Sequence, residues 1–284
     1  MDIALLENTL AIVAQPVGVS VYDFDFALYF DCRHPPFFAP DTPCVLRVGA
    51  VEDYPARYAE LLELGLRPVN SPSEHERASE LDHWYPLLHD LTPRTRIFER
   101  LPPAERIEAE FAWPIFLKGS RQTSKHNAKL SVIGDREHYA WAVEQYQRDP
   151  VLHWQRPAVR EFVPLAPVAG GIAGKVPASL EFRSFWWRGT CVGWGRYWYQ
   201  AAAYACDDIE AGLAIAAEAA RRLQVPFLVV DIAKTADGRW IVIECNDAQE
   251  SGYAAAPPRA IWDAVLAAVA AESKRESAPE GDRP

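Results

Sequence analysis

Apolar positions near the carboxyl end of the chain predict two adjacent strands. Residues 227–230 and 240–243 are β-branched and aromatic, and an Asp-Gly dipeptide between them is a strong hairpin turn signal. Side chains alternate along a strand, so Glu244 and Asn246 should point to one face. The hairpin should bring Asp231, at the end of the first strand, beside them.

Elsewhere, apolar runs and helical spacing predict strands alternating with helices. Further strands are predicted at residues 44–48, 115–118, 159–163, 180–187 and 192–199. Helices are predicted at residues 54–64, 73–88, 136–147, 209–223 and 260–271. This order predicts an α+β architecture with a small amino-terminal α/β unit followed by two subdomains of antiparallel sheet and helix. Ligands favour the cleft between such units.

Composition narrows the possible partners and the compartment. The 284 residues are 49% apolar with a formal net charge of -10, and no basic patch concentrates on one segment, which disfavours nucleic acid and membrane surfaces as partners. The amino terminus lacks a basic signal-peptide region and no segment approaches a membrane span, so we expect a cytoplasmic protein. Five cysteines without a C-x-x-C pair indicate neither a disulfide framework nor a zinc site.

Three predicted strand ends bear candidate chemistry. Asp231, Glu244 and Asn246 are hard oxygen donors that suit a Mg²⁺ ion sharing its shell with nucleotide phosphates, although isolated strand-end polar residues are an equally good interpretation of such a hairpin. Lys118 can extend a buried stem into a cleft, but alone a strand-end lysine is more often solvated. Alternation places Arg183 on one face with Glu181, where the plain alternative is a surface ion pair worth little.

Taken in order, these segments resemble the ATP-grasp superfamily over residues 70–253. Its closing signature is an Asp, a short turn, then Glu-x-Asn, which matches Asp231 and Glu244-Cys-Asn246. The resemblance implies an ATP-grasp fold in which ATP is sandwiched between two α+β subdomains. It places the amino-terminal α/β domain at residues 1–75, the two subdomains at 76–160 and 161–272, and a disordered tail at 273–284.

The same resemblance implies a role for each candidate residue. Arg183 would meet the γ-phosphate or the tetrahedral intermediate, and Asp231, Glu244 and Asn246 would hold Mg²⁺. The residues implied to bind ATP are Lys118 and Lys125 at the phosphates, Glu161, Phe162 and Val163 at the adenine, and Glu181 at the ribose. The strand residues 161–163 by themselves are a weak motif. The family's first phosphate-binding lysine has no counterpart here, since the helix after Asn70-Ser71 offers Arg77 and His83.

The implied activity is an ATP-dependent carboxylate–amine ligase working through an acyl phosphate. Its cofactors would be ATP and Mg²⁺, and its substrates a small molecule or peptide carboxylate with an amine acceptor. Two alternatives stay open: a kinase on the same fold that stops after phosphorylation, and a nucleotide-binding module without turnover, which the missing lysine favours.

Overall fold

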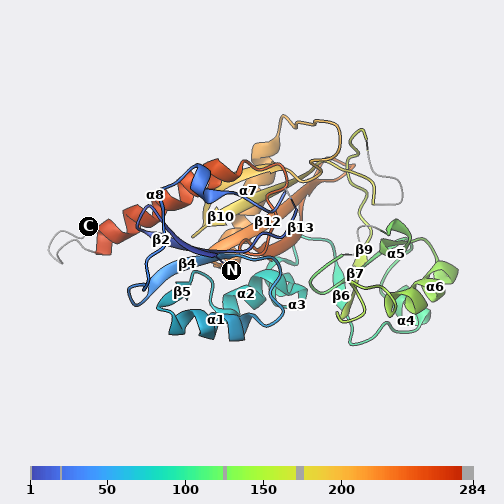
Figure 1. The fold of residues 1–284 in the computed structure, drawn as a ribbon. Helices are drawn as coiled ribbons and strands as arrows, with labels where there is room; N and C mark the ends of the chain where they lie inside the picture. Colours follow the sequence, from blue (N-terminus) through green and yellow to red (C-terminus); the bar gives the residue numbers. More distant parts are fainter. Residues whose placement is uncertain (1, 20, 124–126, 171–175, 277–284) are drawn as a thin grey trace.

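Three β-sheets organise the chain in a computed structural model that describes residues 2–19, 21–123, 127–170 and 176–276 (Figure 1). The amino-terminal sheet has the order β3-β1-β2-β4-β5, with β2, β4 and β5 parallel and the β1 pairings antiparallel. Its strands are β1 (Asp2–Leu6), β2 (Leu10–Ala14), β3 (Cys32–Arg33), β4 (Thr42–Arg47) and β5 (Leu66–Pro68). A 3-10 turn, η1 (Phe26–Leu28), precedes β3.

Three helices lie between this sheet and the rest of the chain. α1 (Tyr54–Glu63) begins after the Asp53 cap, and α2 (Pro72–Ser79) begins with a capping box in which Ser71 and Glu74 bond reciprocally. The single helix predicted at residues 73–88 is wrong, because the chain is extended at Glu80 and α3 (Leu81–Leu88) starts anew. The cause is tertiary: the Leu81 amide donates to the Ser120 carbonyl 3.0 Å away, which ties this break to the middle sheet.

The middle sheet is antiparallel and forms a separate lobe with its helices (Figure 1). Its order is β6-β9-β7-β8, from β6 (Thr95–Ile97), β7 (Ile115–Gly119), β8 (Val132–Ile133) and β9 (Pro157–Glu161). The helices are α4 (Ala104–Glu108), α5 (Ala128–Ser131) and α6 (Arg136–Tyr146). Ile115, Leu117 and Val159 pack into this lobe's core, so the alternate residues of β7 and β9 face the third sheet.

The third sheet is also antiparallel, in the order β11-β10-β12-β13. Its elements are β10 (Glu181–Trp187), β11 (Thr190–Arg196), β12 (Phe227–Lys234) and β13 (Trp240–Asp247), with α7 (Ile209–Leu223) between β11 and β12. The predicted hairpin at 227–243 is confirmed, with Gly238 at φ +90 in its turn. The last predicted strand residues, 197–199, lie beyond the end of β11.

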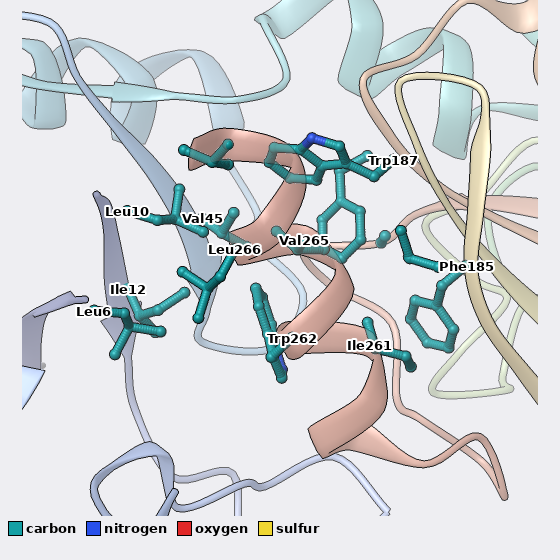
Figure 2. Close-up of a cluster of buried hydrophobic side chains, with 14 of the residues drawn as sticks. Leu6, Leu10, Ile12, Val45, Phe185, Trp187, Ile261, Trp262, Val265 and Leu266 are labelled. Carbon is teal, nitrogen blue, oxygen red and sulfur yellow. The ribbon is translucent and has the colours of Figure 1, made fainter. Parts of the chain in front are cut away.

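Alternation along β12 sends side chains into two cores. Leu228 and Val230 pack in a cluster with Ala216 and Ala219 of α7, whereas Val229 packs in a different cluster with Trp262 of α8 (Pro258–Glu276). Figure 2 shows α8 side chains between those of the amino-terminal sheet and those of β10. This helix therefore joins the first and third sheets through one core. It continues past residue 272, where the tail is predicted to begin, and residues 277–284 lie outside the described chain.

Candidate functional site

An apolar cavity of about 450 Å³ lies between the middle and third sheets. Phe116 of β7 and Ile241 and Ile243 of β13 contribute to its walls. The four residues predicted to contact adenine and ribose all line this cavity, namely Glu161, Phe162, Val163 and Glu181. Flat apolar walls with a few polar groups suit a nucleobase. Trp198 also lines it and donates through its indole N–H to Glu181 Oε2 at 3.0 Å.

Two ion pairs join the charged residues predicted for phosphate and metal. Lys118 Nζ donates to Glu244 Oε1 at 2.6 Å, with both side chains buried. Arg183 grips Asp231 with two bonds, Nε to Oδ1 at 2.8 Å and Nη2 to Oδ2 at 2.7 Å. Burial opposes the charge on the guanidinium, but Asp231 outweighs it and raises the pKa of Arg183. Before any ligand arrives, each carboxylate already has a cation beside it.

Strand register explains this row of charges. Arg183 pairs with Asp231 across β10 and β12, and Asp231 pairs with Glu244 across β12 and β13. Residues directly opposite on neighbouring strands share a face, so three strands present the row together. Asn246 lies two residues beyond Glu244.

A β-bulge in β13 aligns two parts of the site. The register shifts after Asp231, leaving Ile243 as the extra residue between Val242 and Glu244. Val242 and Cys245, three residues apart, both pack into the α7 core, whereas Ile243 and Glu244 both line cavities on the opposite face. Because of the bulge, adjacent residues serve the apolar cavity and the charged row.

Buried Arg160 of β9 holds this bulge against the middle sheet. Its Nη1 donates to the Ile243 carbonyl at 2.7 Å, and its Nε donates to Thr95 Oγ1 at 3.0 Å. Burial lowers the pKa of Arg160 to about 10, although Glu244 acts in the opposite direction. No sequence motif marks this residue, because an arginine within a strand is usually solvent-exposed.

The charged row opens into a second cavity of about 300 Å³. Arg183, Glu244 and Asn246 line it together with Arg121 and Glu250. Asp231 is fully buried beneath Arg183. Among the residues that the structure describes, no three His, Cys, Asp or Glu side chains gather as a metal cluster, so the oxygen set here is two carboxylates and one amide. These hard donors fit the chemistry of Mg²⁺, provided that the cations now bound to Asp231 and Glu244 give way.

The remaining predicted cations lie apart from this row. Lys125 falls outside the described residues. His83 is exposed and lies 3.9 Å from Asp82, and half-buried Arg77 belongs to α2; neither lines the 450 or 300 Å³ cavity.

A polar cluster that no sequence pattern predicts borders a third cavity, of about 570 Å³. His75 Nδ1 lies 3.0 Å from Asp247 Oδ2, and Arg121 Nη2 lies 3.0 Å from His75 Nε2. Glu250 Oε1 accepts the Val51 amide at 2.9 Å, and burial raises the pKa of this carboxyl despite nearby His75. Asn246, Asp247, Arg121 and Glu250 line the cavity, so it adjoins the charged row. The one available signal is that Asp247 and Glu250 directly follow the Glu-x-Asn segment.

Comparison with known families decides the fold. A model of an ATP-grasp domain family, the third family of its clade, matches residues 70–265, which is more than half of the chain. The chain belongs to this ATP-grasp family. The ATP-grasp α+β fold expected from the motifs is therefore confirmed. The match includes both cavity-lining sheets and ends within α8.

Solved structures share the ATP-grasp fold at low identity. The D-alanine-D-alanine ligase from Coxiella burnetii aligns with TM-score 0.57 and 14% identity over 82% of this chain and 69% of its own. The VanG D-Ala:D-Ser ligase from Enterococcus faecalis gives 0.53 and 15% over 78% and 68%. A RimK domain ATP-grasp protein from Sphaerobacter thermophilus gives 0.51 and 18% over 75% and 76%. No curated protein sequence matches significantly. Within the described residues, no helix has the length and apolarity to cross a membrane.

Proposed function

We propose that this ATP-grasp protein is an ATP-dependent carboxylate–amine ligase that forms an amide through an acyl phosphate. The observation that supports it is a single stretch of β13, Ile241 to Asn246, which lines the apolar cavity at one end and the charged cavity at the other. A nucleotide laid along this strand would place its base against Ile241 and Ile243 and its phosphates at Glu244. Ligases are also among the proteins that share this fold.

We assign the nucleotide contacts residue by residue. Glu161, Phe162 and Val163 would contact the adenine, and Glu181 the ribose. Lys118 would neutralise the α- and β-phosphates, joined by Lys125. Nucleotide binding would then replace the Lys118–Glu244 pair with a lysine–phosphate contact, which is charge-assisted and stronger than a neutral hydrogen bond.

The same exchange would free oxygen donors for the metal. Asp231, Glu244 and Asn246 would hold Mg²⁺, which when bound spreads the negative charge that develops on the β- and γ-phosphates. Arg183, released from Asp231, would meet the γ-phosphate or the anionic oxygen of the adduct.

The reaction then proceeds in two transfers. A substrate carboxylate attacks the γ-phosphorus, ADP leaves, and an acyl phosphate forms. An amine attacks its carbonyl carbon, Arg183 stabilises the anionic oxygen of the adduct, and phosphate leaves as the amide bond forms. The expected substrates are small carboxylates or peptides with an amine acceptor, in a cytoplasmic setting without nucleic-acid or membrane partners.

ADP release tests this proposal. The protein is incubated with ATP and Mg²⁺ in mixtures of amino acids and peptides, and ADP and amide products are measured together. We expect ADP to appear in step with amide, and Asp231→Asn and Glu244→Gln to reduce both by at least about a hundredfold, since they remove charge stabilisation made in the transition state.

Asp237→Asn is the matched control, because Asp237 is an exposed carboxylate in the turn of the same hairpin. It should leave turnover unchanged. ADP release with an acid alone, leaving a stable phosphorylated product, would replace the ligase with a kinase. Unchanged turnover in both site variants would remove the metal site.

A further inference from the structure

His75 is a buried histidine with a defined neighbour at each ring nitrogen. Its Nδ1 lies 3.0 Å from Asp247 Oδ2, and its Nε2 lies 3.0 Å from Arg121 Nη2 and 3.9 Å from Glu250 Oε1. The Tyr54 ring stacks on the imidazole with centroids 4.0 Å apart and planes 1° apart. These contacts leave the imidazole with little freedom to rotate.

The hydrogen bonds also determine which nitrogen bears the proton. A guanidinium only donates, so Nε2 must accept from Arg121, and a carboxylate only accepts, so Nδ1 must donate to Asp247. His75 is therefore neutral, with its basic lone pair on Nε2. An imidazole oriented by a carboxylate through Nδ1–H is the arrangement that general bases use.

The carboxylate end of this arrangement is itself held in place. Asp247 is fully buried, its Oδ1 accepts the Gln249 amide at 2.8 Å, and its own amide donates to Ser79 Oγ at 3.3 Å. Gln249 Nε2 donates to Tyr54 Oη at 2.8 Å, which links the stacked ring to the same network. Such support is what a catalytic group requires to keep its geometry.

We propose that the Asp247–His75 pair is the base that deprotonates the acceptor amine, with Glu250 beside it binding the ammonium group. This inference rests on the proposed ligase function and adds its acceptor chemistry: a primary amine that arrives protonated. Glu250, Asp247 and Glu52 give the 570 Å³ cavity three carboxylates, which suits a cation. Asn246 lines the same cavity, so an amine there lies next to the proposed phosphate end.

The proton and bond changes balance without another reactant. His75 Nε2 takes one proton from the ammonium group, and the free amine attacks the acyl phosphate carbonyl. The new N–C bond forms, the C–O bond to phosphate breaks, and the departing phosphate takes the second proton from nitrogen as hydrogen phosphate. His75 then returns its proton to solvent.

Arg121 covers this base in the structure. Besides His75, its guanidinium lies 3.2 Å from Glu80 and 3.7 Å from Glu250. Arg121 also lines the charged cavity beside Arg183. An anionic phosphate bound there would attract Arg121 away from Nε2, so the base becomes accessible only after nucleotide is in place.

His75→Asn tests the base, because the Asn amide can still donate to Asp247 but cannot accept a proton. Acyl phosphate is trapped with hydroxylamine, a nucleophile that is largely unprotonated near neutral pH, and amide is measured with the amino acid or peptide mixture. We expect amide formation to fall by about a hundredfold or more, while hydroxamate formation changes by less than about threefold.

Glu250→Gln and His89→Asn complete the set. Glu250→Gln should raise the KM for the amine with hydroxamate formation retained, and it keeps the test valid should His75→Asn not fold. His89 is exposed and bonds only to Pro86 of its own helix among the described residues, so its variant should behave as wild type.

The outcomes separate the two proposals. A wild-type protein that forms neither hydroxamate nor amide overturns the ligase function, and the base with it. If wild type forms both and His75→Asn retains both, or loses both equally, only the base is overturned.

A substrate-free measurement tests the cover. Diethyl pyrocarbonate labels neutral imidazole nitrogens that reagent can reach, and peptide mass spectrometry reads each histidine separately. Labelling of His75 should rise severalfold in Arg121→Ala, and in wild type with Mg²⁺ and a non-hydrolysable ATP analogue, relative to His89 as internal reference. Equal labelling in all three states would refute the covering role of Arg121.

Discussion

Replacing Arg183 by methionine should separate its ion-pair role from the metal site. Arg183 and Asp231 have side chains that are only 12% and 0% exposed, so Arg183→Met leaves a fully buried carboxylate without its cation. Breaking such a pair costs roughly 3–5 kcal/mol. At roughly 2–4 °C per kcal/mol for a chain of this size, the melting temperature should fall by on the order of 10 °C. Thermal denaturation followed by circular dichroism measures this change.

The control and the metal response sharpen this test. Arg239→Met breaks an exposed pair with Asp237 in the turn of the β12–β13 hairpin, where we expect less than about 1 kcal/mol. Adding Asp231→Asn to Arg183→Met should recover part of the loss. Mg²⁺ alone should raise the melting temperature of Arg183→Met more than that of wild type, because the ion can then serve as the counterion of Asp231. A variant as stable as Arg239→Met, or an identical Mg²⁺ response, would refute the reasoning.

Three further changes probe the cavity, the polar cluster and the core. Ile243→Trp fills part of the 450 Å³ cavity and should weaken binding of a fluorescent ATP analogue by at least about tenfold, with the fold retained by circular dichroism. Burial raises the pKa of Glu250, so the native state loses stability as pH rises from the ordinary carboxyl value toward the raised one; Glu250→Gln, compared with wild type by urea denaturation, should therefore gain more at about pH 7 than at about pH 4. Trp262→Ala removes a fully buried side chain between the first and third sheets and should cost about 3–5 kcal/mol in the same assay; a loss below about 1 kcal/mol would contradict the packing.

The sequence predicts the elements of this fold better than their contacts. Hydrophobic runs and the Asp-Gly turn locate β12 and β13, and helical spacing locates α7 at residues 209–223. The break at Glu80 escapes prediction, because it depends on the Ser120 carbonyl some forty residues later. The bulge at Ile243 escapes it too, since strict alternation would place Ile243 and Glu244 on opposite faces.

The predicted site residues cluster in the structure, but in pairs that the sequence does not indicate. The family motif assigns Lys118 and Arg183 to the nucleotide and Asp231 and Glu244 to the metal, as four separate contacts. The structure instead joins them as cation and carboxylate across neighbouring strands. Which side chain neutralises which depends on register and burial, and single-residue spacing holds no information about either.

This pairing has a consequence for how the site can work. A buried cluster of like charges would destabilise the fold before ligand binds, whereas two cation–carboxylate pairs let both carboxylates stay buried at moderate cost. ATP brings phosphates that compete for Lys118 and Arg183, and Mg²⁺ brings charge that competes for Asp231 and Glu244. Neither exchange is balanced alone, since each leaves buried charges of one sign without partners. Nucleotide and metal should therefore bind with strong mutual dependence, and calorimetric titration with either one alone should show much weaker binding than with both.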